Sequence, residues 1–204
     1  MAGRPRLKGQ MLSTIDDSEL AAAALAGDRE AFGRLVERHY DLIYRVAYRV
    51  MGSAADAEDV AQDVCVTLAT KLARFRNQSR FSTWVVSIAI NRCRDVLRRR
   101  KSSARLAESY VALRDMEDAD RADAERRTTW LTEALQSLEP SLRETVVLIV
   151  GEDMSHKEAA KILGCAESTV SWRMPRATAL PRGHQGFGRT WHTSRIFLIV
   201  GRTF

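Results

Sequence analysis

The pattern of hydrophobic and polar positions indicates helix after helix along the first 174 residues of the chain. Apolar residues recur at steps of three and four between 31 and 51, and again along one face of 54–75. That spacing places them on one side of an α-helix. A sustained two-residue alternation, which would indicate strands, does not occur, and turn residues are sparse. The pattern therefore predicts an all-α fold.

The first part of the chain is expected to form a helical bundle. Its helices are predicted at 18–25, 31–51, 54–75 and 82–101. Asp17 or Ser18 can cap the first helix and Ser53 the third, because these side chains accept hydrogen bonds from free N–H groups in a first helical turn. Residues 76–80 are predicted to form a polar loop between the last two helices.

A composition change separates this bundle from a second, smaller helical domain. Residues 102–126 hold many charges and few apolar side chains, which predicts a mobile acidic linker. Beyond it, Pro140 suits the first turn of a helix, and Ser155 and Glu158 have the spacing of a capping box. A short helix to Leu163, a turn at Gly164 and a second short helix then follow helix-turn-helix spacing.

Two small helical domains joined by a flexible acidic linker are therefore expected. The predicted segments are an N-terminal extension (1–17, disordered), a first domain (18–101), a linker (102–127), a second domain (128–177) and an atypical basic tail (178–204). The tail is rich in glycine and proline, has no acid and lacks helical periodicity. Two interpretations stay open for it: a frameshifted or otherwise foreign end, or a natural tail that adds non-specific DNA affinity.

The charge distribution and the residue counts limit the classes of function that the chain can have. Of the net charge of +6, five units come from arginines after residue 175, so local clusters carry more information than the total. Three separated cysteines and four scattered histidines predict no metal site and no disulfide framework. Phosphate-binding and catalytic motifs are absent from the sequence, so neither an enzyme nor a cofactor is expected. The chain lacks a long apolar run or a signal-peptide core, which predicts a cytoplasmic protein without membrane insertion.

The strongest local signal is for nucleic acid. Between 74 and 101 the sequence has nine Lys or Arg residues and one acid, interleaved with Phe75, Phe81 and Trp84. Aromatic rings can stack on unpaired bases, and guanidinium groups hold phosphates. The second short helix of the helix-turn-helix carries Trp172 and Arg173 on its predicted outer side.

At these residues the chain resembles the small two-domain ECF (extracytoplasmic function) group of sigma-70 family RNA polymerase sigma factors. The resemblance covers roughly 18–177. It depends on several co-linear motifs: DAEDVAQD at 56–63, FSTW at 81–84, IAIN at 88–91, ALQSL at 134–138 and SHKEAAKILG at 155–164. A helix-turn-helix alone would be much less specific.

The resemblance implies a sigma factor, without catalytic activity, that binds core RNA polymerase and recognises the −10 and −35 promoter elements. The residues implied in core polymerase binding are Asp56, Asp59, Val60, Gln62, Asp63 and Val64. Those implied in −10 recognition and melting are Phe75, Asn77, Gln78, Phe81, Trp84, Asn91, Arg92, Arg94, Arg98 and Arg99. Those implied in −35 recognition are Lys157, Glu167, Ser168, Thr169, Ser171, Trp172, Arg173 and Arg176. An anti-sigma factor is a further expected partner, and the free chain is expected to be a monomer.

Two positions depart from the family pattern. Ala166 stands where a capping residue is common. The missing cap costs the second short helix of the helix-turn-helix, its recognition helix, ~1 kcal/mol. Pro175 stands where the family helix continues, and a helix-interior proline costs ~3 kcal/mol. The alternative function is a stand-alone helix-turn-helix repressor or activator, which would have no use for the basic-aromatic segment 75–84.

Overall fold

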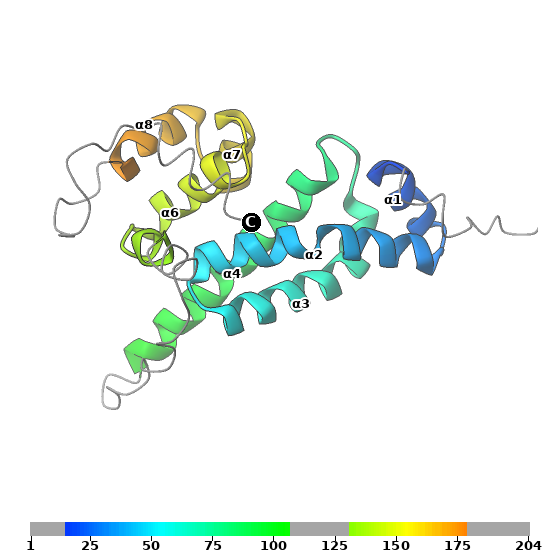
Figure 1. The fold of residues 1–204 in the computed structure, drawn as a ribbon, viewed down its shortest axis with the longest axis horizontal. Coiled ribbons are helices and arrows are strands. Elements are labelled where there is room, and N and C mark those ends of the chain that lie inside the picture. The colour runs from blue at the N-terminus through cyan, green and yellow to red at the C-terminus, as the bar shows by residue number, and fades with distance from the viewer. Residues whose placement is uncertain (1–14, 107–130, 179–204) are drawn as a thin grey trace, which may run out of the picture.

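The computed structural model describes residues 15–106 and 131–178, and every regular element in these two ranges is helical. The helices form two units that pack against each other (Figure 1). The predicted all-α fold with two helical domains is confirmed. The N-terminal extension, most of the predicted linker and the basic tail lie outside the described residues.

The first unit is built around one long central helix. Its elements are α1 (Asp17–Leu25), α2 (Arg29–Met51), α3 (Ala54–Lys71), the 3₁₀ turn η1 (Leu72–Arg74) and α4 (Phe81–Leu106). Helix α2 packs against α1, α3 and α4. Asp28 accepts hydrogen bonds from the N–H groups of Glu30 and Ala31 at its start. Gly52, at φ 76°, ends it in the left-handed conformation that glycine adopts without steric cost.

The core of this unit comes from the apolar positions that show the helical period. Its largest fully buried side chains include Leu35, Ile43, Val46 and Val50 of α2, Val60, Val64 and Leu68 of α3, and Val85 and Ile90 of α4. Helix packing therefore follows the sequence pattern, and the polar faces of α3 and α4 remain at the surface.

Two local expectations need correction or extension. Asp16 is the N-cap residue of α1 and makes no side-chain cap bond, so the capping role expected of Asp17 or Ser18 is wrong. The side chains of those two residues bond to other elements instead, Asp17 to Arg38 and Ser18 to Asn77. At the other end of the unit, α4 continues to Leu106, into the segment predicted as linker.

The second unit begins with a short helix at 131–136. It continues with α6 (Pro140–Val146), the π-helical segment η2 (Val147–Gly151), α7 (His156–Leu163) and α8 (Glu167–Thr178). Pro140 is in the first turn of α6, and the capping box between Ser155 and Glu158 is present. Both features confirm the sequence prediction. Gly164, at φ 65°, turns the chain from α7 into α8.

Helix α8 passes through Pro175 and ends three residues later, at Thr178. Pro175 itself is exposed. A proline late in a helix removes a hydrogen bond only near the end, where carbonyl groups often lack helical partners. The structure therefore accommodates this departure from the family pattern within the recognition helix.

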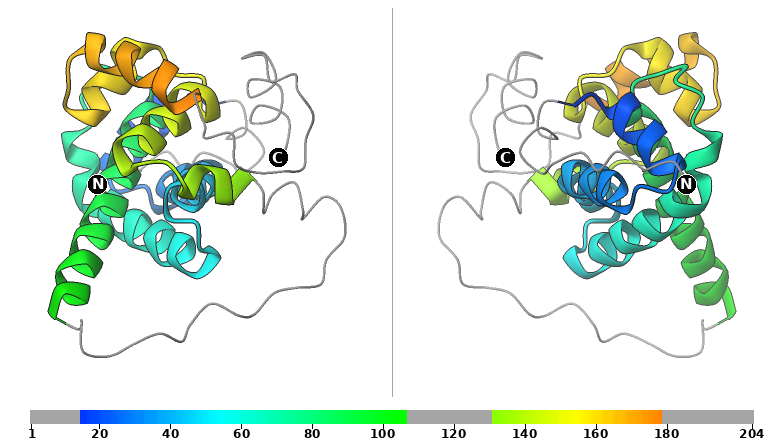
Figure 2. Two further views of the ribbon diagram at one scale, coloured as in Figure 1. Left: turned by 90° about the vertical axis from the view of Figure 1, so that its left-hand side faces the viewer. Right: turned by 90° about the vertical axis from the view of Figure 1, so that its right-hand side faces the viewer.

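The two units meet along one side of the first. Helix α2 contacts α6 and η2, and α4 contacts α7, as the two side views show (Figure 2). The helix-turn-helix of α7 and α8 consequently lies beside the bundle rather than apart from it.

Candidate nucleic-acid interface

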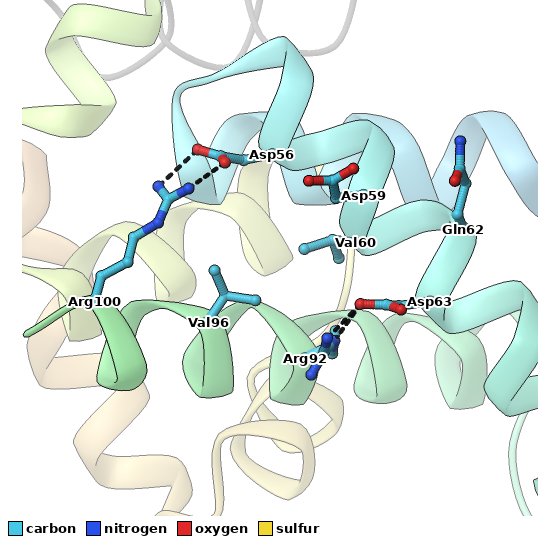
Figure 3. A pocket seen from close by; sticks show the side chains of 8 residues that line it. All are labelled: Asp56, Asp59, Val60, Gln62, Asp63, Arg92, Val96 and Arg100. Carbon is cyan, nitrogen blue, oxygen red and sulfur yellow. Dashed lines mark hydrogen bonds and ion pairs between the residues drawn. The ribbon is translucent and has the colours of Figure 1, made fainter. Parts of the chain in front are cut away.

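A small pocket lies between α3 and α4, on the face predicted to bind core polymerase (Figure 3). It has a volume of about 260 Å³ and is lined by Asp56, Asp59, Val60, Gln62, Asp63, Arg92, Val96 and Arg100. Two arginines of α4 reach across to α3, and Val60 and Val96 lie between these two bridges. The pocket thus combines an apolar floor with a charged rim.

The first bridge joins Arg100 to Asp56 at one end of the pocket. The Arg100 Nη1 donates to Asp56 Oδ2 at 2.7 Å, and Nη2 donates to Oδ1. This hydrogen bonding lowers the pKa of Asp56 below its usual value. The second bridge joins Arg92 Nε to Asp63 Oδ2 at 2.8 Å. Asp56 therefore stays ionised at the protein surface, and Arg92 holds Asp63 in position.

The six residues predicted to bind polymerase divide by exposure. Asp59 and Gln62 are exposed, and Asp56 and Asp63 are partly exposed. In contrast, Val60 and Val64 are 1% and 0% exposed, so these two side chains pack beneath the surface and cannot form it. Val66, which sequence reasoning missed, is 71% exposed on the same helix. Its position four residues after Gln62 could have indicated it, because residues four apart share a helix face.

An aromatic cluster occupies the start of α4 and the loop before it. The rings of Phe75, Phe81 and Trp84 lie 5.1–5.5 Å apart between centroids. Phe81 is only 3% exposed, whereas Phe75 and Trp84 are partly exposed. The exposed loop 76–80 follows Phe75, and Asn77 adopts a positive φ of 54°. The structure therefore brings the predicted aromatic residues together, with Phe81 as the support for the other two rings.

His39 and Asp17 hold this cluster from behind, and sequence reasoning missed that role. The buried ring of His39 lies 5.0 Å from that of Phe81. Its Nε2 is 2.9 Å from Asp17 Oδ2, and Asp17 also accepts from Arg38 Nη1 at 2.7 Å. Burial lowers the pKa of His39, and Asp17 partly opposes that shift. His39 falls on the apolar face of α2, which indicated burial but not its partners.

Helix α4 carries the four arginines predicted to hold −10 phosphates, and three of them pair with carboxylates in the chain. Arg92 pairs with Asp63, as described above. Arg98 pairs with Asp95 one turn earlier, and Arg94 forms two bonds with Glu144 of α6, at 2.9 and 2.6 Å. Arg99 is exposed, and so is Asn91, about two turns earlier on the same helix.

The helix-turn-helix presents a polar and aromatic outer face. Val170 and Ala177 bury the inner side of α8, while Trp172 is 60% exposed. The guanidinium carbon of Arg176 lies 4.4 Å from the centre of the Trp172 ring, a cation–π contact. On the same helix, Ser171 Oγ is 2.9 Å from His156 Nδ1 of α7.

The other residues predicted to contact the −35 element differ in how exposed they are. Lys157, Glu167 and Ser168 are exposed, and Thr169 and Arg173 are partly exposed. Arg173 lies against Cys165 in the turn, with Nη1 4.0 Å from the Sγ. Thr169 and Arg173 are therefore less accessible to DNA than the three exposed residues.

Within 15–106 and 131–178, no cluster of three or more His, Cys, Asp or Glu side chains could hold a metal ion. In the same ranges, each helix is too short or too polar to span a bilayer. Basic and aromatic surfaces, rather than a catalytic or metal centre, are the chemical features that the described residues offer. Two such surfaces, one on each unit of this helical protein, are the candidates for contact with nucleic acid.

Comparison with known proteins identifies the family. Residues 35–103 match the model of sigma-70 region 2, and residues 128–178 match that of sigma-70 region 4. The chain is 34% identical over 165 residues to the ECF RNA polymerase sigma factor SigM of Mycobacterium tuberculosis, covering 80% of this chain and 81% of that protein. It is 32% identical to the RNA polymerase sigma-H factor of Pseudomonas aeruginosa, covering 82% and 92%.

A solved structure of CnrH in complex with the cytosolic domain of CnrY is also similar. It has a TM-score of 0.61 and 31% sequence identity, and the match covers 80% of this chain and 92% of that one.

The chain therefore belongs to the sigma-70 family, in the group of ECF RNA polymerase sigma factors. It is a transcription initiation factor and not an enzyme. The two units of the fold correspond to region 2 and region 4. A stand-alone helix-turn-helix regulator is not favoured, because residues 35–103, most of the first unit, match sigma-70 region 2.

Proposed function

We propose that this chain binds core RNA polymerase through the α3–α4 face and directs it to promoters through two DNA-reading surfaces. The observation that supports this most strongly is the presence of both surfaces on one chain. The aromatic cluster with loop 76–80 belongs to region 2, and the exposed Trp172 and Arg176 belong to region 4. Neither a repressor nor a structural protein needs this combination.

The α3–α4 face offers polymerase a charged rim around an apolar floor. Asp59 and Gln62 are the exposed polar contacts, and Val66 supplies an apolar one. Asp56 and Asp63, which their arginine partners hold in position, complete the rim. Val60 and Val64 support this surface from the core.

The capture of unpaired −10 bases is assigned to loop 76–80 and the aromatic cluster. Asn77, Gln78 and Asn91 offer exposed amides for base edges, while Phe75 and Trp84 offer ring faces for stacking. Phe81 orients these rings from below. Arg92, Arg94, Arg98 and Arg99 are the phosphate contacts, and their contribution to affinity falls with rising salt.

Recognition of the −35 element is assigned to α8 lying in the major groove. Ser168, Ser171, Trp172 and Arg176 are the candidates nearest the bases. Lys157, Glu167, Thr169 and Arg173 lie beside them and would fix the position of the helix.

The chain is proposed to act in the cytoplasm as a monomer when free. The similar structure of CnrH contains the cytosolic domain of CnrY, which supports an anti-sigma partner for this chain as well. The nature of that partner would follow from co-purification of the full chain from its own cells.

Reconstituted transcription tests the proposed function. Core polymerase is incubated with the full chain and fragments of its own genome, and run-off transcripts are mapped with and without the chain. Promoter-dependent transcripts that require the chain are expected. Gln62→Ala should reduce binding to core polymerase, whereas Trp172→Ala should leave that binding intact and reduce transcription from −35-dependent promoters. Absence of both core binding and promoter-dependent transcripts would contradict the proposal.

A further inference from the structure

We propose that Asp17 and Ser18, in the first turn of α1, are positioning residues for −10 base capture. Ser18 holds loop 76–80 through Asn77, and Asp17 holds the aromatic cluster through His39. An unpaired base then meets a loop and a set of rings that are in place before DNA binds. This inference rests on the proposed function, because it takes loop 76–80 and the aromatic cluster as the base-capture site.

The two side chains serve other elements rather than the N-terminus of their own helix. Asp16 is the N-cap residue of α1, and both Asp17 and Ser18 bond to residues far along the chain. They also precede residues 35–103, which match sigma-70 region 2. Leu20, which is 0% exposed, anchors α1 in the core. The place of the helix therefore does not depend on either polar bond, and a substitution can remove one bond at a time.

Ser18 connects α1 to loop 76–80. Its Oγ donates to Asn77 Oδ1 at 3.0 Å, and α1 also contacts η1, the turn directly before Phe75. Asn77 is exposed and has a φ of 54°, in the left-handed region that side chains other than glycine rarely adopt. Such a conformation persists only where the surroundings hold it, and the amide torsion of asparagine is otherwise broad. The bond from Ser18 therefore restrains both the loop and the orientation of its amide.

Asp17 connects α1 to the rings from the other side. Its Oδ1 accepts from Arg38 Nη1 at 2.7 Å, and its Oδ2 lies 2.9 Å from His39 Nε2. Arg38 Nη1 also donates to the carbonyl oxygen of Ile15 at 3.0 Å, which holds the start of α1 on α2. The ring of His39 in turn lies 5.0 Å from that of Phe81, the buried member of the aromatic cluster. One carboxylate thus sets the ring on which the cluster packs.

A restrained capture site favours DNA binding because less conformational freedom is lost when the base arrives. Loop 76–80 is exposed along its whole length, so its own packing restrains it little. The restraint from α1 should consequently appear in the affinity for unpaired −10 DNA. It should not appear in the affinity for core polymerase, because neither Asp17 nor Ser18 belongs to the α3–α4 face.

The test uses variants of the full-length chain, each with a matched control. Ser18→Ala removes the hydroxyl group, and Ser18→Thr keeps it. Ser137→Ala is the control for the lost hydroxyl group, since the exposed Ser137 bonds only locally, to the Ala134 carbonyl oxygen, among the described contacts. Asp17→Ala removes the carboxylate from His39, and Glu19→Ala removes a carboxylate from an exposed position in the same turn of α1. Circular dichroism verifies that each variant folds.

Affinity is measured with the holoenzyme, formed from core polymerase and each variant. The probe is a fluorescent forked DNA that carries the unpaired −10 strand of a promoter mapped by run-off transcription. Ser18→Ala and Asp17→Ala should each weaken fork binding about two- to tenfold, the range expected for one lost hydrogen bond. Ser18→Thr and both controls should stay within about twofold of the wild-type chain. The affinity of every variant for core polymerase should be unchanged.

A double-mutant cycle distinguishes positioning from a general effect on stability. Asn77→Gly removes the amide and leaves a residue that adopts a positive φ without steric cost. If Ser18 acts through Asn77, then Ser18→Ala has no further effect on fork affinity in the Asn77→Gly chain. An equal loss in both backgrounds would mean that Ser18 acts elsewhere, and the positioning role would be refuted.

Unchanged fork affinity in Ser18→Ala or in Asp17→Ala would overturn the role of that residue. If Asp17→Ala does not fold, the Ser18 variants decide the proposal. Transcription by the wild-type holoenzyme separates these failures from that of the proposed function. Promoter-dependent transcripts together with unchanged fork affinity in both variants refute only the positioning role. Absence of core binding and of promoter-dependent transcripts from the wild-type chain refutes the proposed function itself.

Discussion

Arg143 offers the sharpest test of the energetics, because one buried guanidinium connects three segments of the chain. Its side chain donates to the carbonyl oxygens of Leu135, Gln136, Leu138 and Val50, at 2.8, 2.9, 3.1 and 2.8 Å. Three of these acceptors follow or end the helix at 131–136, and Val50 is at the end of α2. Cationic donors at helix C-termini also interact favourably with the helix dipole.

The expected cost of Arg143→Ala follows from these bonds. A hydrogen bond to a charged group contributes about 1.5–3 kcal/mol, so four would give about 6–12 kcal/mol as an upper limit. Carbonyl groups at helix ends recover part of this by binding water once the side chain is gone. We therefore expect a loss of about 3–5 kcal/mol, as for other broken buried charged interactions. Arg143→Lys should cost less, about 2 kcal/mol, because it keeps the charge but cannot reach four acceptors.

Equilibrium urea unfolding followed by circular dichroism measures this loss, with the slope against urea as the check on cooperativity. Lys161→Ala, at an exposed position of α7, is the control and should change stability by less than about 0.5 kcal/mol. A loss below about 1 kcal/mol for Arg143→Ala would refute the reasoning, since it would mean that the four carbonyl groups need no cationic donor.

Three further predictions concern single residues. Ala166→Ser should stabilise the chain by ~1 kcal/mol in urea unfolding, because a serine hydroxyl can cap α8, and Ala166→Val should give no gain. Pro175→Ala should stabilise α8 by less than the ~3 kcal/mol of a mid-helix proline, because Pro175 lies near the helix end; slower amide hydrogen exchange in 171–178 is expected, and unchanged exchange would contradict it. Burial lowers the pKa of His39 from 6.5, so its contribution to stability is complete above that pH and declines as the pH falls toward the lowered value. His39→Gln should therefore reduce the loss of stability between about pH 7 and pH 5, and an identical pH dependence in both chains would refute this.

The helical elements could be predicted because local physics determines them. The period of apolar residues in α2 and α3 and the capping box at Ser155 act within one or two turns, so a single sequence carries the signal. Gly52 and Gly164 likewise mark positions where the backbone adopts a positive φ. The helix-turn-helix and the aromatic segment could be located for the same reason.

The sequence predicted which types of residue form the candidate site. It did not predict which of their side chains are exposed or which residues they pair with. Phe81 and Val64 carry the side chains expected of contact residues, yet both are buried, and composition does not distinguish a stacking ring from a core ring. The pairing of Arg94 with Glu144 joins residues 50 positions apart, and charge complementarity at that separation has no periodic signature. Glu144 lies close to the apolar run 146–150, which was a local indication in the sequence that this acid would be buried and need a partner.

The internal pairing of the α4 arginines also affects how the chain searches for its polymerase. A protein with a pI of about 9.6 is expected to be retained on the bulk of the chromosome by non-specific phosphate contacts. Arg92, Arg94 and Arg98 each already have a carboxylate partner inside the chain. Region 2 therefore offers genomic DNA fewer unneutralised charges than its arginine count implies, and a larger share of free molecules stays available to diffuse to the enzyme they serve.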